Sequence, residues 1–292
     1  SILLAAMFGI VLNVPLVSGS HLLSSALSSS AASASLSADP SPGYYETSEY
    51  LIGSVAVGVV LPESNGGIDP STEDWTESEE SLVITKITKA LNWWASYNPY
   101  AHVVFSTEVK YQVPTNYEPI SRSLWDHGLW ITEAIEYLGY PHVLDYVNDL
   151  RNRLGTKWAF VIFVVDSSND ADGRFTDGVY AHAPIGGPYF IMTYDGPYKG
   201  GITRMDFITA HEIGHIFYAT DEYNGRQEYS GYLNASDHDY ANCLMRWDVW
   251  YLCEDTQEQI GWRDTDSDGI FDIVDTFPET MLNPTLPNPT SN

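Results

Sequence analysis

One apolar segment, Trp158 to Val165 (WAFVIFVV), constrains the fold of this chain more than any other. An unbroken apolar run rich in β-branched and aromatic residues, with no polar alternation, is typical of a strand that is buried on both faces. Such a strand needs further strands beside it and helices above and below the sheet. The segment therefore predicts an α/β protein.

The segments around this strand alternate between strand and helix patterns. We expect further strands at Tyr50–Leu61, His102–Val113 and Gly187–Tyr194, and amphipathic helices from a capping box at Thr76, over Leu129–Leu138, and from Pro141 to Gly155. This order predicts a mixed, twisted sheet with covering helices. The strand at 187–194 has the character of an edge strand, which can add an extended peptide as a further strand.

Both ends of the chain differ in composition from this folded body at 44–262. Residues 1–19 are mostly apolar, too short for a membrane span, and match a secretory signal more closely than an uncleaved anchor. Residues 20–43 are rich in Ser and Ala and predict a disordered linker, and 278–292 form a Pro/Asn/Thr-rich tail. We therefore expect a secreted or cell-surface protein with no stable membrane insertion once the signal is removed.

The charge of the chain argues against two classes of partner. Thirteen basic residues against thirty-nine acidic ones give a net charge of −26. A surface this negative repels nucleic acids and anionic membranes, and it favours solubility and cation binding. The sequence leaves the oligomeric state open.

The motif His211-Glu-Ile-Gly-His215 predicts a zinc site. Residues four apart lie on one face of a helix, so the two imidazoles can hold one metal ion. Glu212 is displaced from that face and can reach a water molecule at the metal instead. Thr203 and Asp206 form a second possible capping box, which predicts a helix through the motif.

Catalytic zinc takes three protein ligands, so a third must lie outside the motif. Asp221 stands six residues after His215, where a helix that ends near Tyr218 would let the chain turn back under the metal. Glu222 is the alternative third ligand, and Glu228 is a poorer one.

The run from His211 to Asp221 resembles the zinc signature of the metzincin metallopeptidases, in the snapalysin-like form whose last ligand is Asp. Downstream, Asn242 to Met245 resembles the Met-turn of that clan, which places a methionine beneath the zinc. The resemblance covers roughly Gly187 to Gly261.

This resemblance implies a zincin-like α+β fold for 44–262, with the Met-turn in a C-terminal subdomain. It also implies a catalytic Zn²⁺ and a secreted endopeptidase that cleaves proteins or peptides, with Glu212 as the general base.

Two positions depart from the metzincin pattern. The clan has glycine where Tyr218 stands, because the chain turns there with positive φ, and a tyrosine in that conformation costs about 1 kcal/mol. Either the turn is made differently, or the third ligand is not Asp221, in which case Glu222 is the substitute. Trp247 occupies the place of a tyrosine that donates to the transition state in some members, and Tyr251 or Tyr223 are the available phenols.

Cys243 and Cys253 are the only cysteines and close a small loop around the predicted Met-turn. In an exported protein they predict a disulfide, which stabilises by about 2–3 kcal/mol. Two reduced thiols would require a cytosolic protein.

Residues 263–277 carry acidic residues at the spacing of a calcium loop. Glycine at the sixth position and a backbone carbonyl at the seventh complete the pattern, which resembles a thrombospondin type-3 or dockerin-like repeat. The predicted ligands of a structural Ca²⁺ are Asp264, Asp266, Asp268, Ile270, Asp272 and Asp275.

Two alternatives to a metzincin peptidase stay open. The first is a zinc peptidase of another zincin group that uses Glu222. The second is a non-catalytic, calcium-stabilised surface or binding protein that retains the zincin fold. The remaining histidines are more simply structural or exposed: His102, His127, His142, His182 and His238.

Overall fold

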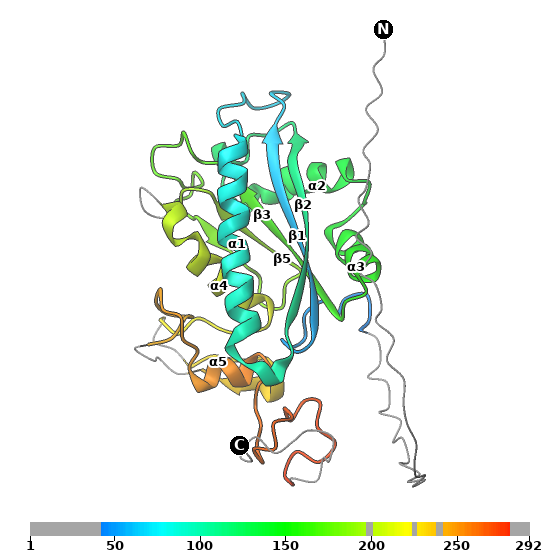
Figure 1. Ribbon diagram of the computed structural model, residues 1–292. Coiled ribbons are helices and arrows are strands. Elements are labelled where there is room, and N and C mark those ends of the chain that lie inside the picture. Colours follow the sequence, from blue (N-terminus) through cyan, green and yellow to red (C-terminus); the bar gives the residue numbers. More distant parts are fainter. Residues whose placement is uncertain (1–41, 197–200, 224–226, 238–241, 281–292) are drawn as a thin grey trace, which may run out of the picture. The chain divides into compact units, whose positions relative to one another are not determined.

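The computed structural model of the chain describes residues 42–196, 201–223, 227–237 and 242–280 (Figure 1). The predicted signal at 1–19 lies outside these residues, as do nearly all of the predicted linker, His238 and most of the C-terminal tail.

A five-stranded mixed sheet forms the centre of the described chain, in the order β2-β1-β3-β5-β4. The first four strands of this order are parallel, and β4 is antiparallel to β5. The buried run Trp158–Val165 is β3, and every residue of it is buried, as its composition predicts. The mixed sheet confirms the α/β class. The strands are β1 (Ser54–Ser64), β2 (Val104–Thr115), β3 (Trp158–Val165), β4 (Ala181–His182) and β5 (Tyr189–Thr193).

β4 is the edge strand on this side of the sheet and β5 is an inner strand, so the prediction that the strand at 187–194 lies at the edge is wrong. β5 pairs with β3 on one side and with β4 on the other. β4 has only two residues, Ala181 and His182, and so short a strand leaves no periodic pattern in the sequence.

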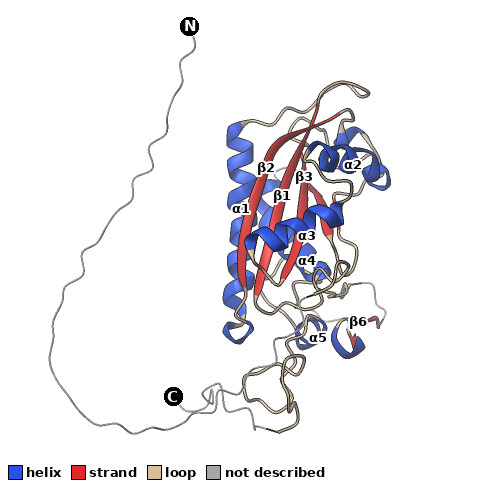
Figure 2. Ribbon diagram, turned by 90° about the vertical axis from the view of Figure 1, so that its right-hand side faces the viewer, coloured by secondary structure: helices blue, strands red, loops and turns tan. Residues whose placement is uncertain are grey.

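Helices cover both faces of the sheet (Figures 1 and 2). α1 (Glu77–Tyr97) and α4 (Met205–Ile216) pack on one face, and α2 (His127–Tyr137) and α3 (Val143–Leu154) on the other. No helix in the described part of the chain has both the length and the apolar character that a bilayer span requires. The smaller elements are α5 (Glu254–Gln259), the paired strands β6 (Tyr229–Ser230) and β7 (Ala235–Ser236), and 3₁₀ helices at Pro99–Ala101, Pro119–Ser121, Leu124–Asp126, Gly201–Arg204 and Tyr232–Asn234.

The first of the two predicted capping boxes forms. The Thr76 hydroxyl accepts from the Glu79 amide at 3.3 Å, and the Glu79 carboxylate accepts from the Thr76 amide at 2.9 Å. α4 begins at Met205, and the residue before it, Arg204, makes no side-chain cap. Asp206, which is 1% exposed, forms ion pairs with Lys89 and Lys86 of α1, so the start of α4 is fixed by its neighbour helix.

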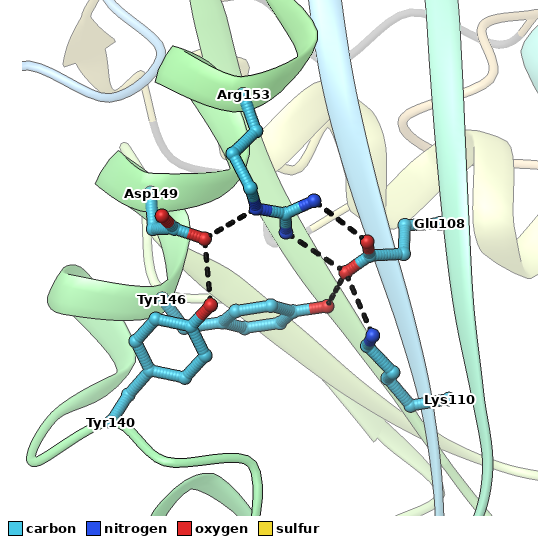
Figure 3. A network of polar contacts seen from close by, with 6 residues as sticks. All are labelled: Glu108, Lys110, Tyr140, Tyr146, Asp149 and Arg153. Atoms are coloured by element: carbon cyan, nitrogen blue, oxygen red, sulfur yellow. Dashed lines mark hydrogen bonds and ion pairs between the residues drawn. The ribbon is translucent and has the colours of Figure 1, made fainter.

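A polar network fastens α3 to β2 (Figure 3). Arg153, in the last turn of α3, lies 2.9 Å from Glu108 of β2 and 2.6 Å from Asp149 of its own helix. The Tyr146 hydroxyl donates to Glu108 at 3.0 Å. Gly58 of β1 lies beneath Tyr146, where a Cβ would stand 3.2 Å from the ring, so glycine lets α3 approach the sheet closely. Tyr140 and Lys110 complete the network.

Candidate metal centre

The two motif histidines project from one face of α4, one turn apart. The ring centroids of His211 and His215 are 4.7 Å apart, and the rings are nearly perpendicular. The helix is held in place from behind, because the Trp94 indole of α1 donates to the Ala210 carbonyl at 3.0 Å. The geometry is that expected of an i, i+4 pair.

Asp221 closes this pair into a three-residue group. Its Oδ1 atom lies 3.1 Å from Nε2 of His211 and 3.3 Å from Nε2 of His215. α4 ends at Ile216, and Tyr218 adopts a left-handed conformation with φ of +74°. The turn that the sequence pattern requires at residue 218 is therefore made, with tyrosine in the place of glycine.

The other nitrogen of each ring is fixed by a backbone carbonyl. Nδ1 of His211 lies 3.0 Å from the Leu244 carbonyl, and Nδ1 of His215 lies 2.8 Å from the Ala219 carbonyl. A carbonyl only accepts, so each Nδ1 carries the hydrogen. In the neutral rings both Nε2 lone pairs then face Asp221 Oδ1. Three acceptors that converge within 4.8 Å fit a divalent cation such as Zn²⁺.

The charges around the histidines also favour a cation. Burial opposes protonation of His211, but the carboxylates of Asp221 and Glu212 outweigh it and raise the pKa of His211 to about 9. Burial likewise opposes ionisation of Asp221, but hydrogen bonds from His211 and His215 hold its pKa well below the usual range. Two carboxylates therefore place a negative potential at the point where the rings meet.

Met245 lies directly against α4 below the histidines. A Cβ built on Gly214 would stand 2.6 Å from the Met245 sulfur. Met245 is fully buried, and the neighbouring Leu244 supplies the carbonyl that orients His211. The segment thus packs beneath the histidines, where the metzincin resemblance implies a Met-turn, and Gly214 makes the room for it.

Glu212 extends into the site with an unused oxygen. The residue is 7% exposed, and its Oε2 atom is buried without a hydrogen-bond partner. The backbone amide of Ala183, just beyond β4, favours the ionised form of the carboxylate. Burial raises the pKa of Glu212, while the two histidines lower it. A carboxyl group of raised pKa beside a metal centre is suited to accept and return a proton.

The centre opens into a cleft of about 470 Å³. Its walls combine the metal-centre residues with the edge strand β4 and with the segment after Met245, including Trp247. Tyr223 lines the cleft and its hydroxyl hydrogen-bonds Asp221, whereas Tyr251 is not part of the lining. Tyr223 is thus the phenol nearer to the centre.

Glu222 does not join the histidines. It is 2% exposed, and its Oε1 atom lies 2.6 Å from the sulfur of Cys253 and 3.1 Å from the Thr256 hydroxyl. Both cysteines are free thiols in the structure, with sulfurs 2.8 Å apart. The disulfide between Cys243 and Cys253 stays a prediction.

The predicted calcium loop brings three of its six residues together. Carboxylate oxygens of Asp264, Asp266 and Asp268 lie within 4.8 Å of one another, and each residue leaves one buried oxygen without a hydrogen bond. Asp272 instead accepts from the amide and hydroxyl of Thr265, at 2.8 and 2.6 Å. The three converging acceptors fit a hard cation such as Ca²⁺.

Among the predicted carboxylate ligands, Asp272 and Asp275 lie outside this group of three. One carboxylate oxygen of Asp275 accepts from the Phe277 amide at 2.9 Å, and Ile270 donates its amide to Asp268 at 2.8 Å.

Several groups at the centre lie outside the sequence prediction. The carbonyls of Leu244 and Ala219 and the amide of Ala183 are backbone atoms, for which side-chain identity gives no signal. His182, predicted to be structural or exposed, lines the cleft. A comparison with known proteins finds no matching family model and no matching curated protein.

Proposed function

We propose that this chain is an exported, zinc-dependent endopeptidase of metzincin type. The observation that carries the proposal is the convergence of His211, His215 and Asp221 on one point, beside the buried carboxylate of Glu212, at the wall of an open cleft. The export of the protein rests on the apolar character of residues 1–19.

The chain's own residues account for the proton transfers of peptide hydrolysis. Zinc, when bound, polarises the scissile carbonyl and lowers the pKa of the attacking water. Glu212 takes a proton from that water at its free Oε2 atom and later delivers it to the leaving amine. The Leu244 and Ala219 carbonyls keep the imidazoles in the tautomer that leaves Nε2 available.

The edge strand β4 supplies a place for the substrate backbone. β4 pairs only with β5 among the described strands, so its other edge is open to an extended peptide. The backbone amide of Ala183, which follows β4, acts on the Glu212 carboxylate, so this end of β4 lies beside the general base. A peptide added at this edge would therefore run past the general base, which supports an endopeptidase rather than a hydrolase of small molecules.

The experiment that tests the proposal is the substitution Glu212→Gln in zinc-loaded protein. The amide keeps the size of the side chain but cannot take a proton, so we expect peptide cleavage to fall by about 10²–10⁴-fold with zinc content unchanged. Glu136→Gln, at an exposed position on α2, is the matched control and should cleave like the wild type. A Glu212→Gln protein as active as the wild type would contradict the mechanism.

The zinc content of two variants tests which residue is the third ligand. Asp221→Asn removes a charged oxygen that faces both histidines, and we expect it to lose most of its zinc on dialysis. Glu222→Gln alters a carboxylate that faces Cys253 and should retain one zinc per chain. The reverse outcome, measured by metal analysis, would assign the ligand to Glu222.

We also propose that Asp264, Asp266 and Asp268 hold a structural Ca²⁺. Calcium at about 100 times its Kd should stabilise the folded protein by about 2.7 kcal/mol. For a domain of this size that raises Tm by about 5–10 °C in a thermal melt of calcium-free protein. Asp268→Asn should abolish this increase, and Asp126→Asn, at an exposed position, should preserve it. An equal increase in Asp268→Asn would refute the site.

A further inference from the structure

The two residues of the edge strand β4 face opposite sides of the sheet. Ala181 pairs with Met192, which belongs to the core under α1 and α4, and His182 pairs with Ile191, which belongs to the core under α2 and α3. Paired residues of an antiparallel ladder share a face. The His182 side chain therefore points to the α2 side of the sheet, whereas α4 packs on the other side, and His182 also lines the cleft.

Trp125 lies against His182 on that side. The two ring centroids are 5.3 Å apart in an edge-to-face arrangement. Trp125 is 67% exposed, which makes it the most exposed tryptophan in the described part of the chain. An indole that stays so exposed leaves most of its apolar surface available to a ligand.

The exposed indole is held by an anchored turn. Trp125 belongs to the 3₁₀ helix Leu124–Asp126, and its amide donates to the Ser123 hydroxyl at 3.2 Å. The Ser123 hydroxyl and the Leu124 amide donate to one oxygen of Asp177, at 2.7 and 3.0 Å. Leu124 is fully buried in the core under α2. The backbone that carries the ring is thus fixed, which reduces the entropy lost when a ligand packs on it.

The chemistry of Trp125 and His182 indicates which kind of substrate side chain would bind between them. Burial is the main cause that lowers the pKa of His182, which favours the neutral imidazole at neutral pH. An indole edge and a neutral imidazole favour an uncharged aromatic ring, which gains both apolar burial and edge-to-face contact.

We infer that Trp125 and His182 form a substrate subsite for an aromatic side chain of an extended peptide paired with β4. This inference rests on the proposed peptidase function and extends it to specificity. Side chains of an added strand alternate between the two faces, and those opposite His182 would stand about 4.5–5.5 Å from it, Cβ to Cβ. One substrate position near the scissile bond therefore meets Trp125, and its neighbours do not.

The test uses a set of quenched fluorescent peptides, Ala-rich except for one Phe moved position by position. For zinc-loaded wild type we expect kcat/KM about tenfold higher when Phe occupies one particular position, through a lower KM at unchanged kcat. Trp125→Ala should remove this preference and leave the all-Ala peptide within twofold. Tyr137→Ala is the matched control, because Tyr137 is 66% exposed at the far end of α2.

Binding separates a failure of the subsite from a failure of the proposed function. The Kd of each peptide is measured on two zinc-loaded proteins, Glu212→Gln and Glu212→Gln/Trp125→Ala. The first should bind the peptide with Phe at the preferred position about tenfold more tightly than the all-Ala peptide. The second should show no such preference. The subsite would be overturned if the wild type prefers Phe and Trp125→Ala keeps that preference. It would also be overturned if Trp125→Ala lowers kcat/KM equally for all peptides. A Trp125-dependent preference for Lys or Arg would overturn the aromatic class. Binding that depends on Trp125 without any cleavage would retain the subsite and refute the peptidase.

Discussion

Tyr218 accepts a backbone conformation that a residue with a side chain rarely adopts. Its φ of +74° is in the left-handed region, which costs about 1 kcal/mol for an L-residue. Two contacts offset this cost. The ring packs on Gly186, where a Cβ would stand 2.7 Å from it, and the hydroxyl bonds the carboxylate of Glu49. The ring thus helps to hold the turn that brings Asp221 to the histidines.

Substitutions at residue 218 separate the strain from the packing. Tyr218→Gly and Tyr218→Ala both lose the ring, but only alanine keeps the left-handed strain. We expect Tyr218→Ala to have a free energy of unfolding about 1 kcal/mol lower than Tyr218→Gly, measured by urea denaturation of zinc-loaded protein. Tyr218→Phe, which keeps the ring and loses only the bond to Glu49, should be the most stable of the three. Equal stabilities for the alanine and glycine variants would show that the conformation is not strained.

For single residues, the sequence predicts which side chains converge at the metal centre but not how they are oriented. The spacing of His211, His215 and Asp221 predicts their convergence because a helix and one turn fix it. Asp221 and Glu222 are adjacent carboxylates, and either could face the histidines. Two backbone features decide between them: the conformation of residue 218, and the 3.0 Å hydrogen bond from the Glu222 amide to the Met245 carbonyl. Neither is visible in residue types.

Between elements, α4 packs tightly against the segment that follows Cys243. Gly214 faces Met245 so closely that a Cβ would lie 2.6 Å from its sulfur and 3.1 Å from its terminal methyl carbon. The same segment carries the Leu244 carbonyl that orients His211. Any displacement of Met245 is therefore transmitted to a predicted zinc ligand.

Gly214→Ala should displace this segment. We expect the free energy of unfolding to fall by about 1–3 kcal/mol from overpacking, and zinc to bind more weakly because the Leu244 carbonyl moves. Adding Met245→Ala should recover part of the zinc affinity, since the shorter side chain leaves room for the new methyl group. Zinc affinity is measured by competition with a chromophoric chelator. Losses in the two single variants that simply add in the double variant would show that the two residues do not interact.

The bounds of helices and strands with a clear hydrophobic period are predicted within a few residues. Very short strands and buried ion pairs are not predicted. The expected helix after Thr76 is α1, and the apolar run at 158–165 is β3. β4 is missed because two residues carry no period. The ion pair between Asp206 of α4 and Lys89 of α1 is missed, because a contact between helices distant in sequence leaves no local pattern.

The excess of acid in the whole chain includes carboxylates that the fold buries. Glu63, Glu73, Glu118 and Asp166 lie close enough to repel one another near the carboxyl ends of β1 and β3. Burial is the main cause that raises the pKa of Glu63 and of Glu73 to about 7, and neighbouring carboxylates add to it. Oδ2 of Asp166, which is 3% exposed, has no hydrogen-bond partner. Ionisation of these four carboxylates therefore lowers the stability of the folded state.

This group gives the stability of the protein a pH dependence of definite sign. Between the unfolded value of 4.5 and the folded value of about 7, the folded state binds more protons at Glu63 and Glu73 than the unfolded state does. The free energy of unfolding should then fall as pH rises through this window, by about 2 kcal/mol in total once solvent screening is allowed for. The double variant Glu63→Gln/Glu73→Gln should flatten the decline measured by urea denaturation from pH 5 to 8. Glu136→Gln should retain it, because that residue is exposed on α2. A stability that rises with pH in the wild type, or an equal slope in both variants, would place the dominant titration elsewhere in the molecule.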